Sequence, residues 1–282
     1  MNLLQILLLG LIQGAAELLP VSSSAHVIVA EKLMGLDPAS PEMTFLLVML
    51  HTGTMFAVAA YFWSAWRTRY FSSWAAFRRM VVLVMVATAC TGVVGFALKH
   101  ILEKLFLGNG DIEQLFSNLY LIAGSLATVG VLIIYSGRHA ESIASDREPD
   151  GRSACWIGAI QGLCLPFRGF SRSGATISTG LLLNIDRVRM EEFSFALAVV
   201  LTPPVIAREA WRLLKDRPHD AHPVHLVQLL GPGLLGMGCS FVAGLLALKF
   251  LSRLLESGRW TWFGYYCLVA AAAVLIIALA GV

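Results

Sequence analysis

The chain has 282 residues, of which 57% are apolar and only 14% are charged, whereas an ordinary soluble domain carries about 25% charged residues. This composition excludes a typical soluble domain and indicates an integral membrane protein. A formal net charge of +3 is too small for a nucleic-acid-binding surface, so no nucleic-acid partner is expected. The five cysteines include no Cys-x-x-Cys pair, so neither a disulfide framework nor a zinc site is predicted.

Eight apolar segments follow one another along the chain. Two of them are interrupted by polar residues, and we predict that each forms a re-entrant helical hairpin, because polar backbone at membrane depth must be covered by protein or by a water-filled cavity. The other six are apolar over about 20 residues, enough to cross a bilayer as a helix. In chain order the elements are hairpin 3–35, spans 43–64, 80–100 and 117–136, hairpin 154–185, and spans 192–214, 226–250 and 260–281.

An internal repeat divides this all-α polytopic protein into two halves. The Ile-Gln-Gly sequence at 12–14 recurs at 160–162, and each copy is followed by a proline and a serine cluster. We predict a single membrane domain made of two repeats, about 1–136 and 154–282, joined by a cytoplasmic loop at 137–153. Each repeat has one hairpin and three spans, so the second repeat is expected to run through the membrane inverted.

Basic residues predict which loops face the cytoplasm, because short cytoplasmic loops are enriched in Lys and Arg. The opposite face has few: Lys32, Lys104, Lys215 and Arg217. The predicted cytoplasmic face carries Arg67, Arg69, Arg78, Arg79, Arg138, Arg147, Arg152, Arg187, Arg189, Arg253 and Arg259. The first hairpin then enters from outside and the second from inside, and their polar tips are expected to meet near the membrane midplane.

The first hairpin concentrates groups that suit phosphate chemistry. Gln13 and Glu17 are four residues apart and share one helical face. Pro20 ends that helix, and the serines that follow can begin another, whose amide groups favour an anion. Ser23 offers a nucleophilic hydroxyl, with His26 three residues further as a candidate acid or base. The plain alternative is that these side chains only hydrogen-bond neighbouring helices, but ionisable groups inside a membrane usually mark function.

The second hairpin contains the sequence Gly-Phe-Ser-Arg-Ser-Gly-Ala-Thr at 169–176. Arg172 lies at predicted membrane depth, where it needs an anionic partner, and its planar guanidinium suits two phosphate oxygens. The alternative is a structural ion pair between Arg172 and Glu17, and the two interpretations are compatible. His51 and Thr52 lie at a point in the first half equivalent to Thr202 and two prolines in the second. Their role is left open, and Pro203 and Pro204 are expected to break their helix.

These two motifs resemble the signatures of the bacitracin-resistance-type undecaprenyl-diphosphatases. The first is Gln-x-x-x-Glu at 13–17 followed by Leu-Pro-Val-Ser-Ser-Ser-Ala-His at 19–26, and the second is the sequence at 169–176. The resemblance extends over nearly the whole chain and includes an interlocked, re-entrant architecture. It implies a phosphatase that converts undecaprenyl diphosphate to the monophosphate, recycling the lipid carrier for cell-wall synthesis, in the bacterial inner membrane with its site open to the periplasm.

The resemblance also implies roles for individual residues. Ser23 is the expected nucleophile, His26 its acid or base partner unless the two exchange roles, Glu17 an acidic group that also holds a divalent cation (Mg²⁺ or Ca²⁺), and Arg172 a phosphate ligand. Further phosphate contacts are expected from Gln13, Ser22, Ser24, Ser171, Ser173, Gly174 and Thr176. The expected partners are a polyprenyl diphosphate lipid and the bilayer, and a homodimer is left open.

The chain departs from the family pattern at two informative positions. Gln13 cannot hold a metal as a second carboxylate would, so Glu17 remains the main acidic ligand. Arg168 replaces a residue that is commonly proline and is a second-rank phosphate contact. Two rival functions remain: a secondary transporter or lipid scramblase, which shares inverted repeats with broken helices, and the acid-phosphatase-like lipid phosphatases, whose lysine-arginine-proline motif is not found in place here.

Overall fold

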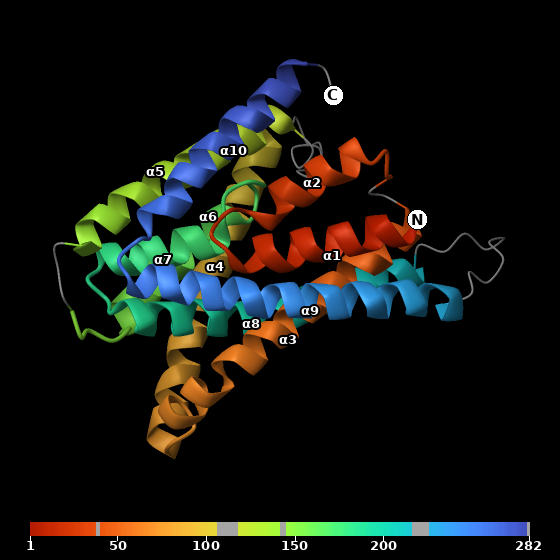
Figure 1. The fold of residues 1–282 in the computed structure, drawn as a ribbon. Helices are drawn as coiled ribbons and strands as arrows, with labels where there is room; N and C mark the ends of the chain where they lie inside the picture. The colour runs from red at the N-terminus through yellow and green to blue at the C-terminus, as the bar shows by residue number, and fades with distance from the viewer. Residues whose placement is uncertain (38–39, 106–117, 142–144, 216–225, 281–282) are drawn as a thin grey trace.

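The computed structural model describes residues 1–37, 40–105, 118–141, 145–215 and 226–280. These residues form ten helices and no strands (Figure 1), which confirms the predicted all-α fold class. The helices are α1 (Leu3–Leu18), α2 (Ser23–Leu33), α3 (Pro41–Arg69), α4 (Trp74–Leu105), α5 (Leu119–Glu141), α6 (Gly151–Cys164), α7 (Arg172–Leu182), α8 (Arg187–Lys215), α9 (Leu226–Glu256) and α10 (Thr261–Leu279).

Six of these helices are long and apolar enough to cross a membrane, and they correspond one to one with the six predicted spans. Large apolar side chains lie on their outer faces as well as between them: Phe96 is 78% exposed, Val93 71% and Val269 70%. A surface of this kind is stable only against lipid. The protein is therefore a multi-pass membrane protein.

Short helix pairs occupy the two segments predicted as hairpins. α1 and α2 pack together, as do α6 and α7, and each pair lies against a long helix of the other half: α1 against α9, and α6 against α4. Figure 1 shows α1 lying along α9, and α5 along α10. Because each short pair packs against a helix of the other half, the two halves form one interlocked bundle. The inverted orientation of the repeats and the re-entrant path of the pairs remain predictions.

Local sequence explains where two of the short helices, α1 and α6, begin. At the start of α1, Asn2 and Gln5 form a reciprocal capping box, and Asp150 and Ser153 form another at the start of α6. The Ser153 amide and the guanidinium of Arg147 hold the pKa of Asp150 below its usual range, so a charged carboxylate stays at the positive end of the α6 dipole.

Two local expectations differ from the structure. The loop predicted at 137–153 is partly helical, because α5 continues to Glu141 and α6 already begins at Gly151; residues 142–144 within it lie outside the described residues. The prediction that Pro203 and Pro204 break their helix was wrong, since α8 continues through both. The two prolines remove the amide donors that would bond the Val199 and Val200 carbonyls, and a membrane helix tolerates this where neighbouring groups satisfy the freed carbonyls.

Gly158 permits the close approach of α6 to α4. A Cβ atom at this position would lie 2.1 Å from the Ala87 carbonyl oxygen and 2.7 Å from the Ala87 Cα. Small residues allow membrane helices to approach in this way, and α6 leads directly to the turn before Arg172. The orientation of the second helix pair therefore depends on this glycine.

We expect Gly158→Ala to destabilise the protein by about 1–3 kcal/mol, the usual cost of overpacking. The measurement is the thermal unfolding midpoint of the purified protein in detergent. Gly92→Ala is the matched control, because a Cβ at Gly92 of α4 meets no atom within 4 Å. Equal midpoints for the two variants would contradict the assigned α4–α6 packing.

Candidate active site

Glu17 lies at the centre of a polar cluster between the two halves. It is on the last turn of α1, one turn after Gln13, whose side chain is buried. The Gln13 amide nitrogen donates to Glu17 Oε2 at 3.2 Å. The Glu17 side chain remains 18% exposed, so a substrate group can reach it.

The turn after α1 places Ser23 against this carboxylate. Ser22 has φ 67° and ψ 95°, an unfavourable backbone conformation for a residue other than glycine, and strain of this kind clusters at functional sites. The turn reverses the chain so that α2 begins at Ser23, whose hydroxyl donates to Glu17 Oε2 at 2.5 Å. A serine hydroxyl hydrogen-bonded to a carboxylate is an arrangement that can activate a nucleophile.

Arg172 reaches the same carboxylate from the second half. It is the first residue of α7, and its Nη2 lies 3.3 Å from Glu17 Oε1. The turn before it requires Gly169, which has φ 97° and whose Cβ would lie 2.6 Å from the Ile122 carbonyl oxygen. The Ser173 hydroxyl donates to the Leu19 carbonyl at 3.3 Å and so joins the two turns. The two polar tips therefore contact each other through Glu17, Arg172 and Ser173, while their depth in the membrane remains a prediction.

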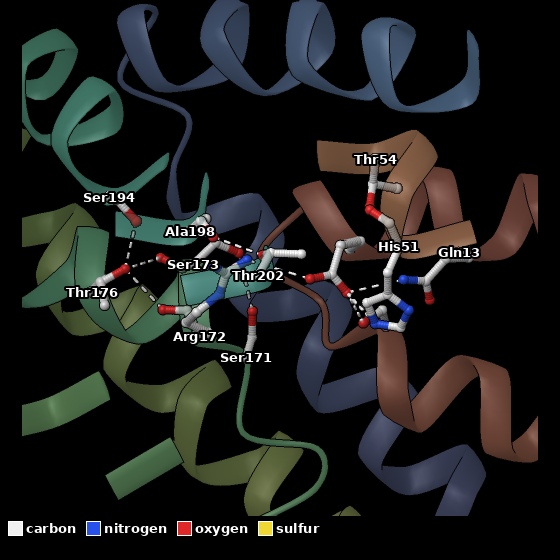
Figure 2. Close-up of polar contacts among 12 residues, drawn as sticks. Gln13, His51, Thr54, Ser171, Arg172, Ser173, Thr176, Ser194, Ala198 and Thr202 are labelled. Carbon is white, nitrogen blue, oxygen red and sulfur yellow. Dashed lines mark hydrogen bonds and ion pairs between the residues drawn. The ribbon is translucent and has the colours of Figure 1, made fainter. Parts of the chain in front are cut away.

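His51 of α3 completes the cluster. Its Nε2 lies 3.9 Å from Glu17 Oε2, and its Nδ1 donates to the Leu47 carbonyl at 2.8 Å. This bond fixes the ring so that Nε2 is directed at the carboxylate. Figure 2 shows His51 and Gln13 on one side of the cluster and Arg172 on the other. From here on, the Glu17 cluster means Gln13, Glu17, Ser23, His51 and Arg172.

Both ring nitrogens of His26 bond groups other than the Ser23 hydroxyl. Its Nδ1 donates to the Ser22 carbonyl at 2.8 Å, so in the neutral ring Nε2 accepts the hydrogen bond from the Tyr266 hydroxyl at 2.7 Å. The two rings are also stacked, with centroids 5.7 Å apart. The expected Ser23–His26 pair is thus not among the described contacts, and Tyr266 of α10 is a partner that the local sequence gave no means of finding.

The other expected phosphate contacts divide into two groups. The hydroxyls of Ser22 and Ser24 lie 3.2 Å apart at the start of α2, a start without a side-chain cap, so its first amides are available to a ligand. Ser171 caps the start of α7 and accepts from the Gly174 amide at 3.2 Å, and Thr176 bonds the Ser194 hydroxyl at 2.6 Å. Three of these groups, Ser171, Gly174 and Thr176, therefore already make bonds that stabilise the fold.

The family described as "Bacitracin resistance protein BacA" matches residues 6–273. This chain belongs to that BacA family. A protein of Acinetobacter baylyi named undecaprenyl-diphosphatase 2 is 56% identical over 284 residues, covering 99% of both chains.

More distant BacA relatives align over the same length. An undecaprenyl-diphosphatase of Halothermothrix orenii is 32% identical and covers all of both chains, and one of Bdellovibrio bacteriovorus is 29% identical over 100% of this chain and 98% of its own. The family predicted from the two motifs is therefore confirmed. The matched lengths cover the segments of both helix pairs and not one motif alone.

The donor atoms of the Glu17 cluster suit a divalent cation only if the substrate supplies most of its ligands. Among the described residues there is no group of three or more His, Cys, Asp or Glu side chains that could hold a metal. Glu17 and the amide oxygen of Gln13 are two oxygen donors, and Mg²⁺ is commonly bound by one or two carboxylates together with substrate phosphates. A cation that arrives with a diphosphate fits this set.

Proposed function

We propose that this BacA-family protein hydrolyses undecaprenyl diphosphate to undecaprenyl phosphate and phosphate in the bacterial inner membrane, with its site open to the periplasmic side. This activity would recycle the lipid carrier for cell-wall synthesis and support bacitracin resistance. The observation that carries the proposal is the convergence of the Ser23 hydroxyl and the Arg172 guanidinium on one carboxylate, Glu17, inside a bundle whose outer surface is apolar. The relatives named as undecaprenyl-diphosphatases support the substrate.

Substrate binding begins with an exchange of partners at Arg172. In the structure its guanidinium neutralises Glu17, and a diphosphate brings a stronger negative charge to the same place. Arg172 binds phosphate oxygens, joined by the uncapped amides at the start of α2. The prenyl tail stays in lipid. A divalent cation held by Glu17, Gln13 and the phosphates would add positive charge that stabilises the transition state.

Release of Arg172 leaves Glu17 free to act as a base. Ser23 Oγ attacks the terminal phosphorus and passes its proton to Glu17, while the bond to the bridging oxygen breaks and undecaprenyl phosphate leaves. Water then attacks the phosphoserine, and Glu17 returns the proton to Ser23 Oγ as inorganic phosphate departs. His26 bonds Tyr266 in the structure, so its exchange with Ser23 as nucleophile would require the ring to turn.

The first test is phosphate release from a long-chain prenyl diphosphate by the purified protein in detergent, with and without Mg²⁺ or Ca²⁺. We expect release by the native chain and background release by Ser23→Ala, because that variant lacks the attacking hydroxyl. Ser257→Ala is the control: this exposed serine lies directly after α9, and among the described contacts its hydroxyl donates to the Leu254 carbonyl alone. A native chain that is inert under all these conditions would contradict the phosphatase, and the transporter alternative would take its place.

A further inference from the structure

The thiols of the five cysteines fall into two classes. Three of them donate to a backbone carbonyl: Cys164 to Ile160 at 3.1 Å, Cys239 to Leu7 at 3.6 Å and Cys267 to Pro20 at 3.3 Å. Cys90 and Cys155 instead meet each other, with 3.0 Å between their sulfur atoms. Because a thiol is a weak donor that commonly bonds a helix carbonyl, this pair stands apart from the rest.

The sulfur atoms of the pair are near bonding distance and are held by a rigid interface. A disulfide requires about 2.0 Å between sulfurs, so a short movement closes the bond. The backbones on either side are fixed, because α4 and α6 pack closely at Gly158 and because the Thr91 hydroxyl donates to the Gly158 carbonyl at 2.9 Å. Gln161 adds a bond from its amide nitrogen to the same hydroxyl at 3.0 Å.

Cys155 is the accessible member of the pair. It is exposed, whereas Cys90 is partly buried, and it lies near the start of α6, five residues after the Asp150 cap. Arg152 and Trp156 beside it are also exposed, and a basic residue with a tryptophan is typical of a membrane–water interface. Cys155 is therefore the sulfur of the pair that a reagent at the membrane–water interface meets first.

We propose that Cys90 and Cys155 form a thiol pair that is reversibly oxidised to a disulfide by a small-molecule disulfide. The Cys155 thiolate attacks one sulfur of the reagent and releases the first thiol; the Cys90 thiolate then attacks Cys155 in the mixed disulfide and releases the second. The two protein thiols are oxidised, the reagent is reduced to two thiols, and the two protons pass to them. The new bond ties α6, which leads to the turn before Arg172, to α4 of the first half.

The test is peptide mass mapping of the full chain after treatment with oxidised glutathione and alkylation of the remaining thiols. We expect a linked peptide containing Cys90 and Cys155, with Cys164, Cys239 and Cys267 alkylated, and full reversal by a reducing agent. In Cys90→Ser the second step cannot occur, so the glutathione adduct should remain on Cys155. Cys164→Ser is the control and should form the same linked peptide as the native chain.

Two results would overturn the proposal. One is alkylation of all five cysteines in the treated native chain, and the other is a link that involves a different cysteine. Size-exclusion profiles of the Ser variants should match that of the native chain, so that a failure to link cannot come from misfolding. None of these measurements uses phosphate release, so their outcome is independent of the proposed phosphatase function.

Discussion

Glu17→Gln is expected to lower the rate of phosphate release by about 10²–10⁴-fold, the usual contribution of a positioned acid or base. The amide has nearly the same shape as the carboxylate but cannot accept the proton of Ser23, and it presents no charge to a cation. Ser23, Gln13 and Arg172 all bond this carboxylate in the structure. The measurement is kcat with a long-chain prenyl diphosphate at saturating substrate and cation.

Glu103→Gln provides the control for removal of a carboxylate. Glu103 forms an ion pair with Lys99 one turn away on α4, at 3.5 Å, and has no contact with the Glu17 cluster among the described residues. Its replacement should leave kcat unchanged. Retention of native turnover by Glu17→Gln would remove the proposed base and would leave His51 or His26 to take the proton.

Arg172→Gln is expected to lower kcat by about 10²–10³-fold, comparable to the loss of one oriented donor that stabilises transition-state charge, and to raise KM. Arg172 lies on the second helix pair, 155 positions along the chain from Glu17, so this variant tests whether both halves contribute to one site. Arg172→Lys should recover only part of the activity, because an ammonium group cannot form the planar, two-point contact with phosphate.

The matched control is Arg152→Gln, which removes an exposed arginine from the first turn of the neighbouring helix α6. Its kcat and KM should equal those of the native chain. If Arg172→Gln changes neither constant, the pair between Arg172 and Glu17 is a structural contact only, and the phosphates must be bound elsewhere.

The sequence predicted those parts of the fold that composition and local spacing determine. Apolar length alone identified the six spans, because an unbroken apolar helix of that length is stable only in lipid. Pro20 and the serines after it located the turn between α1 and α2, because proline disfavours the continuation of a helix and serine favours a helix start. Helix ends were less predictable: α5 extends five residues beyond the predicted limit at 136, and its last turn carries Arg138 and His139, which suit the negative end of the helix dipole.

The candidate site was predictable where its residues are charged and was not where it depends on tertiary packing. Glu17 and Arg172 were identifiable because each is costly in an apolar segment, and their pairing followed from the repeat. The position of His51 beside Glu17 depends on how α3 packs against α1. The bond from Tyr266 to His26 joins positions 240 residues apart, and no local pattern around either residue specifies it.

Trapping the covalent intermediate tests the attack by Ser23 most directly. The native protein would be mixed with prenyl diphosphate labelled in its terminal phosphate, quenched in acid within one turnover and digested for peptide analysis. We expect label on the peptide that contains Ser23, as phosphoserine stable to acid, and no labelled peptide from Ser23→Ala. Label on His26, or rapid phosphate release without labelled protein, would contradict it.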